Sequence, residues 1–144
     1  MEMNGETMIH RSIEEVSEYV LDVNNDANWR YGVDESGFRS GDSINSGTVG
    51  FTRVGKVVVE WKVISSIRDE SVDWELLNGP IKGCGGYRFK SVENETLFTL
   101  VSNVEPTGFY KLLGPLFRWI GRRRNQTDVE NLREILEFPA ETAS

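Results

Sequence analysis

The sequence has almost none of the residues that build disulfides or zinc sites. It contains one cysteine, Cys84, and one histidine, His10. A single cysteine cannot form an intrachain disulfide, and these two side chains cannot supply the four ligands of a structural zinc site. We therefore exclude zinc, and we expect neither another metal nor a cofactor.

Positive charge and long apolar runs are also scarce. The chain has 16 Lys and Arg against 23 Asp and Glu, and its net charge of −7 repels phosphate backbones and anionic membrane surfaces. No apolar run approaches the ~20 residues that cross a bilayer, and the opening "MEMNGETMIHRS" lacks the basic and then apolar pattern of a signal peptide. We expect a cytoplasmic protein with no nucleic-acid partner and no stable membrane insertion.

What the sequence does have is enough apolar material for one core. Its 144 residues are 38% hydrophobic and 10% aromatic, which fits one folded domain. We predict a single domain over residues 1–138, a frayed tail over 139–144, and a monomer or weak homodimer.

The pattern of turns and apolar residues predicts an antiparallel sheet between two helical regions. "ETMIH" is a short opening strand, and "SIEEVSEYVLD" follows as a helix with Ser12 and Glu15 in capping-box spacing. "VNNDANWRYG" allows one further helical turn near Trp29, which we expect to be buried. Six strands with short connections then indicate an antiparallel meander: 33–40, 48–54, 56–68, 71–78, 82–92 and 95–104.

Alternation within these strands predicts one wet face and one aromatic face. "VVVEWKVISS" places Val59 and Trp61 opposite Glu60 and Lys62. The same rule places Trp74, Tyr87, Phe89, Phe98 and Leu100 on the covered face, and Tyr87 could orient a ligand oxygen because a buried hydroxyl needs a partner.

Residues 107–138 have a helical pattern that can cover this face. Gly114-Pro115 either kinks the helix or marks its true start. Leu113, Leu116, Phe117 and Ile120 form one apolar stripe, while Val129, Leu132 and Leu136 form a second stripe rotated by about a quarter turn. The first stripe continues through Arg124 and Asp128. We interpret these two as an exposed ion pair rather than as the edge of a cavity, because charged residues are rarely buried without a partner.

The order of these elements resembles a known fold. The segments "IHRSIEEVSEYVLDVNNDANW", "GTVGFTRVGKVVVEWKV", "GPIKGCGGYRFKSVENETLFTL" and "GFYKLLGPLFRWIGRRRNQTDVENLREILE" are similar to the SRPBCC, or START-like, superfamily, in its polyketide cyclase/dehydrase-like branch. The resemblance implies an α+β helix-grip fold of the START/Bet v 1-like type. In this fold a seven-stranded curved antiparallel sheet wraps around a long C-terminal helix, with one or two short helices after the first strand.

The resemblance also implies an elongated cavity for a lipid, polyketide or aromatic compound. The predicted lining combines aromatic-face residues with the first helical stripe: Trp29, Phe51, Val59, Trp61, Trp74, Tyr87, Phe89, Phe98, Leu100, Leu113, Phe117, Ile120 and Arg124. We favour binding or transport of such a ligand. A cyclase or dehydrase, which would need a buried ionisable group in the cavity, and an interaction module with a filled interior are the alternatives.

No catalytic residue is assigned from the sequence. His10 is interpreted as a surface residue, and Cys84 in "GCGG" as part of a bulge or close backbone approach. Asp22 and Asp26 could lie at a cavity mouth, but helix capping is the preferred interpretation of both.

Overall fold

The computed structural model describes residues 2–77, 81–106 and 114–138, with residues 2–3, 81, 105–106 and 114–123 described for their backbone alone. The predicted tail 139–144 and Leu113 lie outside this description, as do the side chains of Phe117 and Ile120. The elements are, in order: β1 (Glu2–Ile9), α1 (Ile13–Leu21), η1 (Val23–Asn25), α2 (Asp26–Trp29), β2 (Glu35–Phe38), β3 (Val49–Val54), β4 (Val57–Ile67), β5 (Ser71–Leu76), β6 (Ile81–Val92), β7 (Glu95–Pro106) and α3 (Gly114–Glu137).

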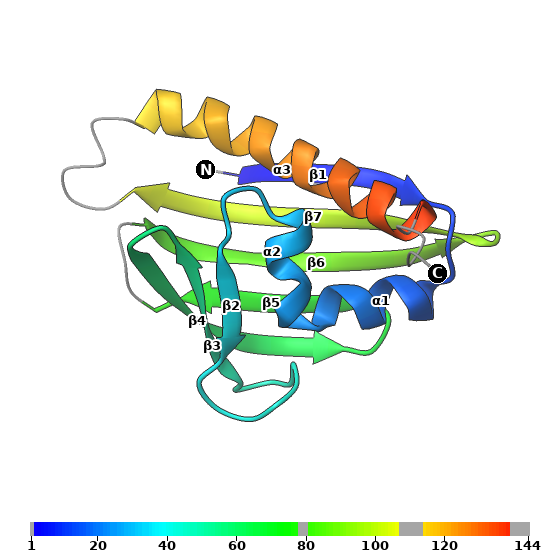
Figure 1. Ribbon diagram of the computed structural model, residues 1–144, viewed down its shortest axis with the longest axis horizontal. Helices are drawn as coiled ribbons and strands as arrows, with labels where there is room; N and C mark the ends of the chain where they lie inside the picture. Colours follow the sequence, from blue (N-terminus) through cyan, green and yellow to red (C-terminus); the bar gives the residue numbers. More distant parts are fainter. Residues whose placement is uncertain (1, 78–80, 107–113, 139–144) are drawn as a thin grey trace, which may run out of the picture.

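The seven strands form one antiparallel sheet in the order β1-β7-β6-β5-β4-β3-β2. All consecutive strands from β2 to β7 are neighbours, as short turns require, whereas β1 pairs with the last strand. The helices lie on one face of this sheet, with α3 running along β1 and β7 (Figure 1). This arrangement confirms the predicted helix-grip architecture.

Both predicted helices, α1 and α3, are present in the structure. Ser12 caps α1, and its side chain accepts a hydrogen bond from the Glu15 amide at 3.3 Å. The long helix is described from Gly114 to Glu137. The residues before Gly114 lie outside the described part of the chain, so both possibilities for Gly114-Pro115 remain predictions.

The core is the aromatic face of the sheet packed against the helices. Fully or nearly fully buried members include Phe98 and Leu100 from β7, Val16 and Val20 from α1, and Val129 and Leu132 from α3. The second stripe of the C-terminal helix thus makes the sheet contact in its described part.

A close crossing ties α3 to the opening strand. A Cβ on Gly5 would lie 2.5 Å from the Asn125 carbonyl oxygen, so only glycine fits there without a shift. One residue later, the Gln126 side chain accepts from the Glu6 amide (3.2 Å) and donates to the Glu6 carbonyl (3.1 Å). These bonds cap the free edge of β1 and fix the position of the helix turn that carries Arg124.

Candidate functional site

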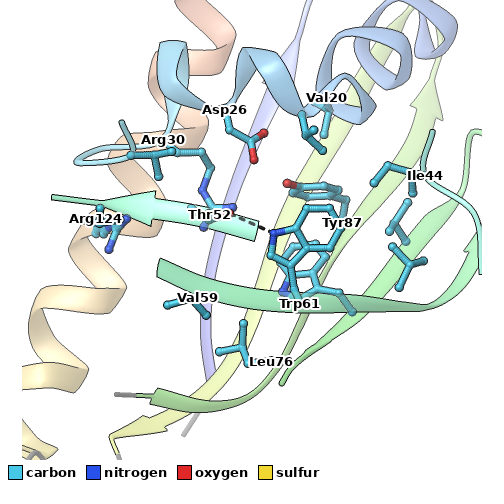
Figure 2. Close-up of a pocket in the computed structure, with 16 residues that line it drawn as sticks. Val20, Asp26, Arg30, Ile44, Thr52, Val59, Trp61, Leu76, Tyr87 and Arg124 are labelled. Carbon is cyan, nitrogen blue, oxygen red and sulfur yellow. Dashed lines mark hydrogen bonds between the residues drawn. The ribbon is translucent and has the colours of Figure 1, made fainter. Parts of the chain in front are cut away.

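A cavity of about 180 Å³ lies between the sheet and the helices. Sixteen residues from the sheet and all the helical elements line it: Val20, Val23, Asp26, Arg30, Val33, Ile44, Thr52, Val54, Val59, Trp61, Val63, Val72, Trp74, Leu76, Tyr87 and Arg124 (Figure 2). Val54 is 38% exposed, so the cavity reaches the surface near the end of β3. Most of the lining is apolar, and its volume suits a molecule of about one aromatic ring.

The structure brings five of the predicted site residues together in this lining: Val59, Trp61, Trp74, Tyr87 and Arg124. Four others lie in the packed core outside the lining: Trp29, Phe89, Phe98 and Leu100. The rings of Trp29 and Phe98 pack against Tyr87 at centroid distances of 6.1 and 5.7 Å. These core aromatics support the cavity wall.

Phe51 is placed away from the cavity. Its neighbours in β3, Gly50 and Thr52, face inward, and strand alternation then turns Phe51 outward, where the Arg39 guanidinium lies 4.3 Å from its ring. The inward position opposite Trp61 holds glycine because any Cβ on Gly50 would collide with the indole ring. Trp61 in turn donates from Nε1 to the Thr52 hydroxyl at 3.1 Å.

One end of the cavity is polar. Asp26 projects from α2 toward the Tyr87 hydroxyl, and Arg30 and Arg124 approach from the end of α2 and from α3 (Figure 2). Asp128, one turn after Arg124, lies behind them: its Oδ1 accepts from the Tyr31 amide at 2.8 Å, and its Oδ2 lies 3.5 Å from Arg30 Nε. Two guanidinium groups, two carboxyl groups and a phenol are thus gathered where the remaining walls are hydrocarbon.

This arrangement corrects the preferred interpretation of Arg124 and Asp128. The sequence favoured an exposed ion pair, but Asp128 is fully buried and Arg124 lines the cavity. The reason is a partner that the helix pattern cannot show, because Arg30 comes from a segment almost a hundred residues earlier. Asp26 likewise departs from the capping interpretation, because it is buried in the lining, whereas Asp22 does cap η1 by accepting from the Asn24 amide at 3.1 Å.

Burial shifts the titration of the polar residues. It raises the pKa of Asp26 to about 6, although the positive charge of Arg30 opposes the shift. Burial and the charge of Asp26 raise the pKa of Tyr87. Burial and repulsion from Arg30 lower the pKa of Arg124, while Asp128 offsets part of that effect. Asp26 is therefore the group in the lining whose charge can change near neutral pH.

Four buried side-chain atoms at this end have no hydrogen-bond partner among the described residues: Asp26 Oδ1, Arg30 Nε, Arg124 Nε and Asp128 Oδ2. Arg30 Nε and Asp128 Oδ2 nevertheless face each other as an ion pair 3.5 Å apart. Buried polar atoms are rarely left unpaired, because each costs about 1–3 kcal/mol. Water or a polar group of a bound molecule can satisfy them, which makes this end of the cavity a recognition surface.

The predicted lining omitted Arg30, and Asp26 was interpreted as a helix cap rather than as a lining residue. The available signal was their four-residue spacing in "DANWR", which places both on one side of a helical turn. The inward positions Thr52, Val63 and Leu76 also line the cavity and follow from strand alternation, but the lining prediction omitted them.

The remaining candidates lie outside the cavity. His10 is on the surface with its side chain 70% exposed, and its Nδ1 lies 2.7 Å from Glu95 Oε1. Cys84 is an exposed free thiol on β6. Within the part of the chain that the structure describes, no cluster of three metal-ligating side chains occurs, and none of the helices is long and apolar enough to cross a bilayer.

The fold and this cavity between sheet and helices define the chain as a START-like protein with the helix-grip fold. Its sequence over residues 2–137 matches the family described as "Polyketide cyclase / dehydrase and lipid transport", and the chain belongs to that family. No curated protein sequence matches the chain.

Solved structures share this fold at low sequence identity. TTHA0849 from Thermus thermophilus has a TM-score of 0.78 and 18% identity, with 95% of this chain and 97% of that chain covered. A START superfamily protein from Mycobacterium smegmatis has a TM-score of 0.77 and 14% identity, with coverage of 94% and 97%. The Aha1 dimer from Colwellia psychrerythraea has a TM-score of 0.69 and 18% identity, with coverage of 96% and 97%.

Proposed function

We propose that this protein binds a small, largely apolar molecule in the cavity between the sheet and the helices, and that it carries this molecule rather than using it as a permanent cofactor. The observation that supports this proposal most directly is the cavity itself, with apolar side chains along most of its wall and unpaired polar atoms at one end. Its volume of about 180 Å³ suits a one-ring compound or part of a longer chain. The cytoplasmic location, the lack of a nucleic-acid partner and the monomeric or weakly dimeric state remain predictions from composition.

The test is to fill the cavity and measure binding of a neutral ring. Val63 is buried on β4 and lines the cavity, whereas Val58 on the same strand is exposed. Val63→Phe should lower the affinity for fluorobenzene, measured by ligand-observed fluorine NMR, by about tenfold or more because the larger side chain occupies the ring's place. Val58→Phe makes the same exchange on the surface and should leave the affinity unchanged.

Native mass spectrometry of the freshly purified protein would identify a bound cellular ligand. Equal fluorobenzene affinity in wild type and both variants, or no binding in any of them, would contradict the proposed function.

A second candidate function is proton transfer at a carbon acid, and the observation that favours it is Asp26. A carboxyl group with a pKa of about 6 in an apolar cavity can hold or accept a proton near neutral pH. With a bound β-diketone, the Asp26 carboxylate would take a proton from the carbon between the carbonyl groups. The negative charge would move to an oxygen facing Tyr87 and Arg30, and the return of the proton would restore the ketone.

The catalytic candidate predicts hydrogen exchange at that carbon. In deuterated buffer, the protein should speed up deuterium incorporation into benzoylacetone, followed by proton NMR, and Asp26→Asn should remove this acceleration. Asp42→Asn, the same exchange at an exposed position, serves as the control. If wild type and Asp26→Asn exchange at the same rate while both bind the diketone, the protein is a carrier and the catalytic candidate is wrong.

A further inference from the structure

We propose that the polar end of the cavity is a subsite for one carboxylate group of an apolar ligand, held between the guanidinium groups of Arg30 and Arg124, and that Asp26 takes up a proton when this anion binds. The inference rests on the proposed function, because it needs a ligand in the cavity. It adds the chemical class of that ligand, an apolar acid, and a dependence of binding on pH.

The first argument is the charge that the site leaves unsatisfied. Asp128 accepts a hydrogen bond from the Tyr31 amide with Oδ1 and pairs with Arg30 through Oδ2. Both partners belong to the segment between α2 and β2, so the carboxylate holds that segment against α3. Arg124 lines the cavity, and its Nε has no hydrogen-bond partner among the described residues. The repulsion between Arg30 and Arg124 is one cause of the lowered pKa of Arg124. An anion placed between the two cations would relieve that repulsion.

The second argument concerns the shape and the charge of the ligand. A guanidinium group presents its donors as a planar fork that matches the two oxygens of a carboxylate. Beyond the polar end, Val59, Val63 and Leu76 offer hydrocarbon surface for the rest of the molecule. A phosphate dianion fits this site less well, because Asp26 and Asp128 repel a second negative charge and because the walls next to the subsite are apolar.

The third argument concerns the proton on Asp26. Four groups act on it directly: Asp22 and Arg30 on either side in the chain, the Ser36 hydroxyl from β2 and Tyr87 from β6. From α3, Arg124 lines the same cavity, and Asp128 pairs with Arg30. A ligand carboxylate near these groups adds negative charge close to Asp26 and favours its neutral form. Neutral Asp26 can then donate a hydrogen bond to the ligand, which uses a carboxyl group whose Oδ1 is otherwise unpaired in the described residues.

Binding of the anion should therefore be coupled to proton uptake. The affinity for an apolar carboxylate should rise as the pH falls from 8 to 5.5, because more of the protein already carries the proton that the complex needs. The carboxylate itself stays ionised over this range. A neutral ligand of the same shape should show no such trend.

The experiment compares 3-fluorobenzoate with 3-fluoronitrobenzene, which have the same shape but differ in charge, by ligand-observed fluorine NMR. In wild type at pH 6 the carboxylate should bind about tenfold more tightly or better, the gain typical of charge-assisted hydrogen bonds. Arg124→Gln should remove this preference, because it should weaken binding of the carboxylate far more than binding of the nitro compound. Arg133→Gln, the same exchange at an exposed position of α3, should keep the preference.

The pH arm uses Asp26→Asn, an uncharged mimic of the protonated acid. Wild type should bind 3-fluorobenzoate about fivefold more tightly or better at pH 5.5 than at pH 8, whereas Asp26→Asn should bind it with the same affinity at both values. Isothermal titration in two buffers of different ionisation heat would show the proton uptake directly in wild type and its loss in the variant.

The outcomes separate the two proposals. If neither fluorinated compound binds, the proposed one-ring binding function fails, and the subsite fails with it. If both bind equally in wild type and in Arg124→Gln, the cavity binds ligands and only the anion subsite is wrong. If Arg124→Gln weakens both compounds to the same degree, Arg124 shapes the cavity rather than binding charge, and the subsite is again wrong. A wild-type carboxylate affinity that is independent of pH overturns the role of Asp26.

Discussion

Asp26 is buried where its negative charge is unfavourable, and its interactions with Arg30 and Ser36 compensate only in part. Its pKa in the folded protein, about 6, is higher than the value of 3.8 expected for an unfolded chain. The folded state therefore binds this proton more strongly than the unfolded state does. Ionisation of Asp26 lowers stability as the pH rises from about 4 through 6, and below pH 4 the penalty is absent.

This penalty predicts that Asp26→Asn stabilises the protein near neutral pH. The shift corresponds to about 3 kcal/mol at most above pH 7. The difference in unfolding free energy between variant and wild type should grow by about 1 kcal/mol between pH 5 and pH 8, because wild-type Asp26 ionises over this range. Urea unfolding at several pH values measures it, and a difference that is constant or shrinks with rising pH would show that Asp26 is not penalised by burial.

Single residues also show where sequence patterns stop being informative. Alternation placed Trp61 and Tyr87 on the covered face because each strand position has only two possible sides. Phe51 was also predicted to line the cavity, yet it points outward, because the inward position opposite Trp61 is Gly50. Asp128 could not be predicted, because its burial depends on Arg30 from a distant segment, and a helical projection contains no information about the partner.

At the scale of elements, the position of α3 depends on one glycine in β1. The Asn125 carbonyl oxygen of α3 occupies the space that a side chain at Gly5 would need, and the obstacle is backbone, which cannot rotate away. Because Asn125 follows Arg124 directly, a shift of the helix at this crossing would also move the polar end of the cavity.

We therefore predict that Gly5→Ala lowers stability by about 1–3 kcal/mol, as overpacking of a tight contact does, and weakens ligand binding as well. Chemical unfolding and the fluorobenzene titration would measure the two effects. Gly41→Ala is the control, since its added Cβ meets no atom within 4 Å and its cost is limited to strain at a φ of 72°. A Gly5 variant that is no less stable than the Gly41 variant would show that the helix yields easily at this crossing.

The bounds of an element were predictable where the local sequence pattern determines them. They were less predictable where they depend on pairing with a distant strand. The meander from β2 to β7 followed from short turns and alternation, and its limits agree closely with those observed. The opening strand was predicted to begin at residue 6, yet β1 begins at Glu2. Three of its first four residues, Glu2, Asn4 and Gly5, are poor strand formers, so this part carries no strand signal. They become a strand because β7 extends far enough to pair with them, Glu2 opposite Asn103.

At the scale of the whole molecule, the fold and the family were recognisable from the order of elements, but the chemistry was not. The family description names cyclases, dehydrases and lipid transport, so membership leaves carriage and catalysis both open. The group whose behaviour would distinguish carriage from catalysis, Asp26, lies at the polar end of the cavity. The proposed exchange and pH experiments distinguish two roles for it: Asp26 either exchanges its proton with a bound ligand or only changes its protonation in response to the ligand's charge.

The pairing of β1 with β7 also has a consequence for protein synthesis. The first strand leaves the ribosome long before the strand that completes its ladder, and α3, which covers the aromatic face, follows later still. Until about residue 132 has emerged, the growing chain therefore lacks Val129 and Leu132, which belong to the same buried core as Phe98 and Tyr87. The nascent chain should depend on chaperones during that interval, and it cannot form the complete cavity until α3 has docked.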